Sequence, residues 1–234
     1  MSKPLVLVAG GSSAAGIAVA RALLGAGMRV LTVGSDAGRI GAAAQAAGGA
    51  VPLVCDLSDP GSVAALAARI HADFGAVDGL IHLVGGWRGG ATLTDQGDAD
   101  WDFLNTSVLT TLRNTSRAFY DDLADSPVGR LAIVSSTSVT APTAGNANYA
   151  TVKAAAETWV RSVAHGFKTG AAAPADSSAA VVLVVKALLD DGMRQRSPER
   201  TFPGFTDVGV LAEAVVGLFS ADAHAINGTR VILD

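Results

Sequence analysis

The sequence predicts an α/β protein of a single domain, in which a doubly wound parallel sheet is covered by helices on both faces. Short apolar runs alternate with longer segments of helical composition, as expected of repeated strand-helix units. The strand-like runs are almost continuously apolar, which is typical of parallel strands buried on both faces. Of the 234 residues, 50% are hydrophobic, enough for one sizeable core. No repeat or low-complexity linker divides residues 1–234, so one domain is expected.

The first expected unit is a strand over residues 5–9, a glycine-rich turn and a helix over residues 16–24. Further strands are expected over residues 29–33, 50–55, 79–84, 130–135, 179–185 and 230–233. Further helices are expected over residues 38–47, 60–74, about 98–123 and 148–167. This alternation is that of a Rossmann-type sheet.

Three stretches read as loops, namely residues 85–97, 169–178 and 190–206. The first and third follow the carboxyl ends of strands, where doubly wound sheets bind their ligands. Glycines and prolines interrupt residues 190–206. This last segment is therefore expected to be either a mobile lid or an ordered surface excursion.

Bulk properties exclude several classes of protein. The formal net charge of -4 offers no basic stripe for nucleic acid. No apolar run reaches the roughly 18 residues of a membrane span, and the start lacks the pattern of a signal peptide. The single cysteine, Cys55, lies in an apolar run and has no internal partner, which suits a reducing compartment. We therefore expect a cytoplasmic protein without nucleic-acid or membrane partners.

The turn after the first strand is rich in small residues. It reads Gly-Gly-Ser-Ser-Ala-Ala-Gly over residues 10–16, where the free amides and dipole of a following helix can face a pyrophosphate. Gly10 permits a sharp turn, and Gly16 permits close packing of the helix. Small residues also serve ordinary connections, but this position in an alternating chain favours nucleotide binding. The candidate contacts here are Gly10, Ser12, Ser13, Ala15 and Gly16.

A second pattern, Tyr149 and Lys153, places a phenol and an ammonium group four residues apart on one helix face. A phenol with a pKa near 10 ionises more readily beside a cation, which suits it to acid-base catalysis. Such pairs are common on helix surfaces. Ser136 ends a predicted strand thirteen residues before Tyr149, where its hydroxyl could hydrogen-bond a substrate carbonyl.

The order of these features resembles that of the short-chain dehydrogenase/reductase family across almost the whole chain. The resemblance implies an NAD(P)H-dependent oxidoreductase that transfers hydride to a small carbonyl or cyclic imine-like substrate. Tyr149 would then be the general acid, Lys153 would also bind the nicotinamide ribose, and Ser136 would orient the acceptor. The features in family order are the glycine turn, Asp56, Ser136, Tyr149 and Lys153.

The resemblance also implies cofactor contacts outside the glycine turn. Asp56 should accept a hydrogen bond from the adenine amino group, with helix capping as its alternative role. After the second strand, Gly34 stands where NAD-binding members carry an acid, whereas Ser35 and Arg39 suit a 2'-phosphate. Asp36 would repel that phosphate if it pointed inward, so NADP(H) is only slightly favoured over NAD(H). The further contacts are Leu57, Gly85, Gly86, Tyr149 and Lys153.

Several positions depart from the family pattern. Ala9 and Ala14 replace a threonine and a glycine around the turn. Val108 stands where an asparagine usually supports a proton-relay water, with Asn105 about one turn away. Lys186 follows the sixth strand where Pro-Gly is usual, and it either reaches a cofactor phosphate or is solvated. In residues 82–85 only the glycine of the usual Asn-Asn-Ala-Gly remains.

Two loops, residues 83–90 and 188–194, are similar to those of dihydropteridine reductases, which belong to the same family. This similarity makes Trp87 and Met193 candidate substrate contacts together with Ser136. Trp87 either stacks on a flat substrate ring or packs internally. Against a dihydropteridine reductase, those enzymes lack the serine at position 136, and their NADH-selecting acid is absent here.

The remaining expectations concern metals, partners and alternative functions. His82 ends a strand without other ligand-type residues nearby, so it is expected to be packed or hydrogen-bonded, and no metal site is expected. The helices over residues 98–123 and 148–167 form the dimer interface in many relatives, which implies a homodimer or homotetramer. The partner is a small-molecule substrate. The alternatives are a non-redox biosynthetic enzyme and a cofactor-binding regulator on the same scaffold.

Overall fold

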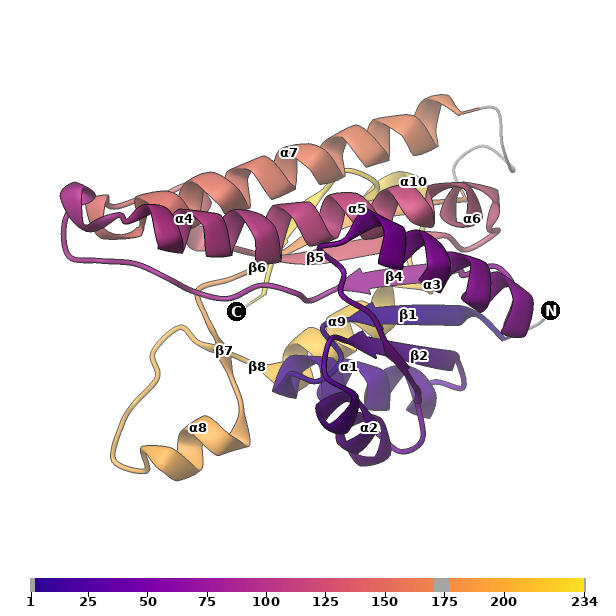
Figure 1. Cartoon of the computed structure of the whole chain (residues 1–234), viewed down its shortest axis with the longest axis horizontal. Helices are drawn as coiled ribbons and strands as arrows, with labels where there is room; N and C mark the ends of the chain where they lie inside the picture. The colour runs from indigo at the N-terminus through magenta and orange to yellow at the C-terminus, as the bar shows by residue number, and fades with distance from the viewer. Residues whose placement is uncertain (1–2, 171–176, 234) are drawn as a thin grey trace.

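The computed structural model describes residues 3–170 and 177–233. Its main sheet has seven parallel strands in the order β3-β2-β1-β4-β5-β6-β9 (Figure 1). Because the order reverses between β1 and β4, a ligand crevice is expected at the carboxyl ends of these strands. The strands are β1 (Leu5–Ala9), β2 (Arg29–Gly34), β3 (Val51–Val54), β4 (Gly79–His82), β5 (Arg130–Ser136), β6 (Ala179–Val185) and β9 (Arg230–Ile232).

Helices cover both faces of this sheet (Figure 1). Successive side chains of a strand point to opposite faces, so Leu5 and Leu7 join one hydrophobic cluster while Val6 and Val8 join the other. The first cluster packs under α3 (Pro60–Asp73), α5 (Thr111–Ala118) and α7 (Ala147–Thr169). The second packs under α1 (Ala14–Gly25), α2 (Ala37–Ala46), α9 (Val208–Leu218) and α10 (Ala223–Ile226). The predicted single-domain Rossmann-type architecture is confirmed.

The expected helix over residues 98–123 is present, with two irregularities. It consists of α4 (Asp98–Leu104), a π-helical stretch (Asn105–Thr110) and α5, which follow one another without a gap, and of α6 (Tyr120–Asp125). The Thr111 hydroxyl donates to the carbonyl of Ser107, and the Thr115 hydroxyl donates to the carbonyl of Thr111. Such bonds to the preceding turn bend helices. Phe119, with a φ of -112°, then separates α5 from α6.

The expected loop over residues 190–206 contains regular structure. It holds α8 (Asp191–Arg196), and its two ends are joined by a small parallel ladder of β7 (Leu188–Leu189) with β8 (Thr206–Asp207). The excursion stands out from the main body on the side of the carboxyl ends of the strands (Figure 1). Asp190 caps α8 and Asp207 caps α9. Neither α9 nor α10 was predicted, although aspartate before an apolar run is a readable start signal.

The other expected elements begin and end within two residues of their predicted bounds. The loop expected over residues 169–178 falls partly outside the described residues, and α7 continues to Thr169. Over residues 3–170 and 177–233, no helix is both long and apolar enough to cross a membrane.

Candidate active site

Two adjoining cavities open at the carboxyl edge of the sheet. The larger, of about 790 Å³, includes on its wall Gly10, Ser12, Ser13, Ser35, Arg39, Asp56 and Leu57. The smaller, of about 300 Å³, includes on its wall Ala15, Gly86, Trp87, Ser136, Tyr149 and Lys153. Both are lined by Leu83, Val84 and Gly85, at the end of β4. The cavities therefore meet at the point where the strand order reverses.

The glycine turn between β1 and α1 is held closely. Gly10 has a φ of +82°, and a side chain there would place Cβ 2.9 Å from the main chain of Leu83. A Cβ at Gly16 would lie 2.6 Å from the carbonyl oxygen of Gly10. Ser13 caps α1, since its hydroxyl oxygen accepts from the Gly16 amide at 2.9 Å. The start of α1 is thus aimed at the larger cavity, and the added methyl group of Ala14 is exposed.

At the end of β2, a hydroxyl and a guanidinium group line the larger cavity. Asp36 caps α2 by accepting from the amide of Arg39 at 2.8 Å, and its Oδ1 lies 3.8 Å from Arg39 Nε. The acidic group is therefore committed to the helix start and to Arg39. Ser35 and Arg39 line the larger cavity. This end of the cavity suits a phosphate group, because it offers a hydroxyl and a guanidinium group.

Asp56 lies on the turn after β3. Its Oδ1 accepts hydrogen bonds from the amide and the hydroxyl of Ser58. The helix that follows is capped instead by Asp59, which accepts from the amide of Ser62 at 2.7 Å. Asn114, a buried residue of α5, secures the turn by donating to the carbonyls of Leu57 and Ser58. The capping alternative for Asp56 is thereby wrong, and its carboxylate lines the larger cavity.

Ser136, Tyr149 and Lys153 converge on the smaller cavity from β5 and from the first two turns of α7. The Ser136 hydroxyl oxygen accepts from the amide of Ser138 at 3.1 Å. Lys153 is buried, and its Nζ donates to the carbonyl of Val134 at 2.8 Å. The same Nζ lies 5.8 Å from the centre of the Tyr149 ring. Two hydroxyls and an ammonium group thus border a single space.

Burial changes the acid-base properties of these groups. Burial lowers the pKa of Lys153 to about 8, and the nearby Glu157 carboxylate works in the opposite direction. Burial also raises the pKa of Tyr149, an effect that the Ser136 hydroxyl partly offsets. The pKa of His82 falls to about 3, because of burial and then of the Lys153 charge. His82 is therefore neutral, and its Nε2 lies 3.1 Å from the Thr111 hydroxyl, as the prediction of a packed or hydrogen-bonded residue required.

The π-helical stretch places an apolar group beside the lysine. A Cβ at Gly85 would lie 3.5 Å from Val108 Cγ2 and 3.8 Å from Lys153 Nζ, so all three are close neighbours. Val108 is buried, while Asn105 stands at the start of the stretch. The position from which an asparagine would support a water relay is consequently hydrophobic.

The loop over residues 85–97 is tied to the start of α7. The carbonyl of Gly145 accepts from the Gly90 amide at 2.8 Å and from Gln96 Nε2 at 3.1 Å. Gln96 in turn accepts from the amide of Asn148, the residue before Tyr149. Trp87 is 63% exposed and borders the smaller cavity. Internal packing therefore does not describe this tryptophan.

Two other residues considered above lie at or near the excursion over residues 190–206. Lys186 Nζ donates to the carbonyl of Pro203 at 3.0 Å. Lys186 is exposed, as the solvated alternative required, and it also borders the smaller cavity. Met193 lies in α8, where its amide donates to Asp190. Along this part of the chain, the residues that line the smaller cavity reach only to Leu188, so Met193 is not among them.

Sequence reasoning missed several residues that shape the site. Gln96, Asn114 and Ser138 hold its loops, and Glu157 lies one helical turn beyond Lys153. Only Glu157 had a usable signal, because the spacing of four residues from Lys153 places both on one helix face.

Comparisons with known proteins agree with this geometry. The sequence model of the short chain dehydrogenase family matches residues 4–171. The 3-oxoacyl-[acyl-carrier-protein] reductase FabG of Salmonella typhimurium is 27% identical, over 96% of this chain and 93% of that protein. A short chain oxidoreductase from Pseudomonas aeruginosa PAO1, described as containing an atypical catalytic center, superposes with a TM-score of 0.86 at 21% identity, over 99% of this chain and 95% of its own. The NADPH-bound structure of a short chain oxidoreductase from the same organism, with the same description, gives a TM-score of 0.82 at 21% identity, over 98% and 95% of the two chains.

Proposed function

The chain belongs to the short chain dehydrogenase family and is an NAD(P)-dependent oxidoreductase, and on this premise we propose that it reduces a carbonyl or cyclic imine group of a small substrate. One observation carries the proposal. The hydroxyls of Ser136 and Tyr149 and the ammonium group of Lys153 border the same small cavity, which adjoins the larger one at Leu83–Gly85. A reacting group in the small cavity would meet proton donors and a cation together.

In the proposed reaction, the bound nicotinamide cofactor supplies the hydride. Tyr149 donates the proton to the substrate oxygen or nitrogen, because burial raises its pKa and keeps the phenol protonated. The ammonium group of Lys153 favours the phenolate that is left behind. The Ser136 hydroxyl donates to the substrate oxygen and so holds it beside Tyr149.

The proposed cofactor is NADP(H) rather than NAD(H). Ser35 and Arg39 line the larger cavity and suit a 2'-phosphate, while Asp36 caps α2. The start of α1 would bind the pyrophosphate, and the carboxylate of Asp56 would accept from the adenine amino group. The NADPH-bound oxidoreductase of similar fold supports this choice. The proposed cofactor-binding residues are Gly10, Ser12, Ser13, Ala15, Gly16, Ser35, Asp56, Leu57, Gly85, Gly86, Tyr149 and Lys153.

The substrate class has two candidates. Similarity to the 3-oxoacyl-[acyl-carrier-protein] reductase favours a 3-oxoacyl thioester. The exposed Trp87 at the wall of the smaller cavity favours a flat ring that stacks on its indole, such as a quinonoid dihydropterin. These two substrates differ in shape, so one panel separates them.

The test is titration with NADPH and NADH, followed by an assay of nicotinamide absorbance against a panel of substrates. The panel contains a 3-oxoacyl thioester, simple ketones and aldehydes, and a quinonoid dihydropterin. We expect tighter binding of NADPH and turnover of at least one member. Tight cofactor binding with no turnover of any member would contradict the reductase proposal and favour a cofactor-binding regulator or a non-redox enzyme.

A further inference from the structure

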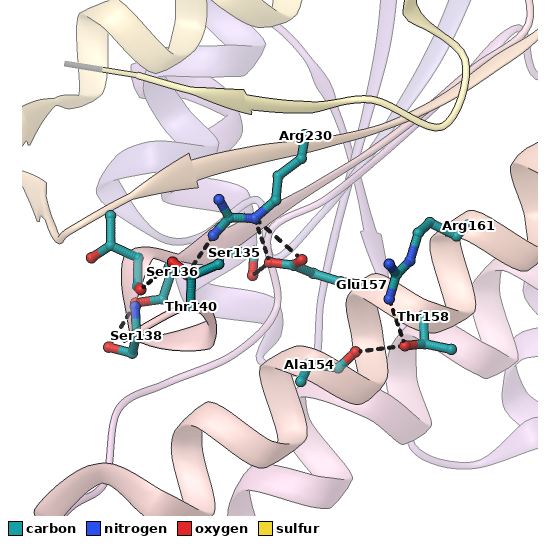
Figure 2. Close-up of polar contacts among 10 residues, drawn as sticks. Ser135, Ser136, Ser138, Thr140, Ala154, Glu157, Thr158, Arg161 and Arg230 are labelled. Atoms are coloured by element: carbon teal, nitrogen blue, oxygen red, sulfur yellow. Dashed lines mark hydrogen bonds and ion pairs between the residues drawn. The ribbon is translucent and has the colours of Figure 1, made fainter. Parts of the chain in front are cut away.

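A buried charged network lies behind the site, on the side of α7 that faces the sheet. Glu157 is 6% exposed and follows Lys153 by one helical turn. One of its oxygens accepts from the Ser135 hydroxyl at 2.6 Å. Both of its oxygens lie 3.3 Å from Nε of Arg230, which reaches α7 from β9 (Figure 2). The carboxylate thus joins α7 to two strands.

Arg230 makes a second contact, with the site itself. Its Nη2 donates to the main-chain carbonyl of Ser136 at 3.1 Å (Figure 2). β6 lies between β9 and β5 in the sheet, so the arginine side chain extends over β6 to reach this carbonyl. One guanidinium group therefore holds both Glu157 and the residue that carries the candidate Ser136 hydroxyl.

A need for stability does not account for such a network. Taking two charges out of water costs about as much as their attraction returns, and well-packed apolar residues often serve as well. The neighbouring positions Ala156 and Val160 already belong to the hydrophobic core. The charged pair instead provides hydrogen bonds of fixed geometry. It contacts Ser135 and Ser136 at the end of β5, and Glu157 faces Lys153 along α7.

We propose that Glu157 and Arg230 are positioning residues, which hold Ser136 and Lys153 in register with Tyr149 through Ser135 and the Ser136 carbonyl. This inference rests on the proposed function, in which Ser136, Tyr149 and Lys153 carry the reaction. Neither member of the pair would touch substrate.

The charges around Lys153 make the inference testable. Tyr149 and Glu157 face Lys153 along α7, neutral His82 faces it from β4, and Arg230 stands beyond Glu157 on β9. The Glu157 carboxylate favours the ammonium form of Lys153. Arg230 is the ion-pair partner of Glu157, so its positive charge is expected to oppose that effect. Removing the Glu157 carboxylate and removing the Arg230 guanidinium should therefore move the pKa of Lys153 in opposite directions.

The experiment uses the full chain and the variants Glu157→Gln and Arg230→Met. Steady-state reduction is measured across pH, and the side-chain carbon signal of Lys153 is titrated by NMR, assigned by its loss in Lys153→Arg. We expect kcat to fall about tenfold or more in both variants with little change in KM. The pKa of Lys153 should fall below its value of about 8 in Glu157→Gln and rise in Arg230→Met. Shifts of the same sign, or unchanged kcat in both variants, would overturn the proposal.

Arg161→Met is the matched control. Arg161 is an exposed arginine of α7 whose guanidinium donates to the Thr158 hydroxyl at 3.0 Å (Figure 2). The substitution removes one positive charge from α7, the helix that carries Glu157, without disturbing a contact to Glu157 or β5. Wild-type kcat and a wild-type Lys153 titration are expected. An effect as large as that of Arg230→Met would show that general loss of charge, not positioning, is responsible.

Arg230→Lys guards against a variant that fails to fold. It retains the charge but replaces the two nitrogens that bridge Glu157 and the Ser136 carbonyl with a single one, so kcat should fall while the Lys153 titration stays close to that of the wild type. NADPH affinity reports whether each variant keeps the cofactor site. If the wild-type chain reduces no member of the panel, the proposed function fails, yet the NMR titration still tests the pair. If the wild type is active and both the Glu157 and the Arg230 variants match its kcat, the positioning role is contradicted while the proposed function stands.

Discussion

The two sides of the carboxyl edge are held together in different ways. Around the larger cavity, most side chains bind amides two or three residues away, as Ser13 does with Gly16 and Asp36 with Arg39, and Asn114 is the distant exception. Around the smaller cavity, most of the bonds join distant parts of the chain. Lys153 and Val134 are 19 residues apart, and Arg230 and Ser136 are 94 apart. Cofactor contacts thus depend mainly on local backbone geometry, whereas the catalytic groups depend mainly on how α7 and β9 pack against β5.

The largest expected effect falls on the catalytic side. Tyr149→Phe removes the proton donor, so kcat for reduction should fall by a factor on the order of 100 or more. Because the aromatic ring is kept and the other proposed cofactor contacts are unchanged, the affinity for NADPH, measured by quenching of protein fluorescence, should stay within about threefold of the wild type. Activity that survives this change would show that another group donates the proton.

A substitution in the glycine turn should weaken cofactor binding instead. Gly16→Ala places a Cβ 2.6 Å from the carbonyl oxygen of Gly10, within main chain that cannot give way easily. Overpacking of this kind costs about 1–3 kcal/mol, so NADPH affinity should weaken by about tenfold or more. Gly25→Ala, in the same helix, is the control, because among the described residues no heavy atom beyond its chain neighbours and its own helical backbone would lie within 4 Å of its Cβ. Equal effects of the two changes would contradict this account of the turn.

The dependence of activity on pH sharpens the comparison on the catalytic side. The ammonium form of Lys153 is lost as pH rises through about 8, so the reduction rate should fall about tenfold between pH 7 and pH 9. The unfolded chain, with a lysine pKa of about 10.5, binds more protons over this range, and the contribution of Lys153 to stability therefore increases. A loss of rate accompanied by unfolding, followed by circular dichroism, would point to another cause.

The smallest expected effect concerns the choice of cofactor. Arg39→Gln removes a positive charge from the wall of the larger cavity, and the group is exposed, so the effect is modest. The affinity for NADPH should fall about fivefold, while that for NADH stays unchanged. Arg69→Gln, which removes an exposed arginine from α3, should alter neither. An equal loss for both cofactors would exclude a 2'-phosphate contact at Arg39.

The regions that sequence reasoning predicted well are those with local causes. The glycine turn was expected because a strand, small residues and a helix follow one another directly, and Ser13 caps the helix as that order suggests. The spacing of Tyr149 and Lys153 placed them on one helix face, and both line the same cavity. The helix over residues 98–123 was expected, but its π-helical stretch and the break at Phe119 were not, because the threonine hydroxyls that bond to the preceding turn give no distinct pattern in the sequence.

The sequence by itself determined the order of the seven strands of the main sheet and of the helices up to α7, the turn before α1, and the candidate groups at positions 136, 149 and 153, since these follow from composition, spacing and family resemblance. Only the tertiary structure decided which side chain meets which across the sheet. It tied Lys186 to Pro203, held the turn after β3 with Asn114, and brought Arg230 to Glu157. The reason is physical: partners far apart along the chain are chosen by strand order and helix packing.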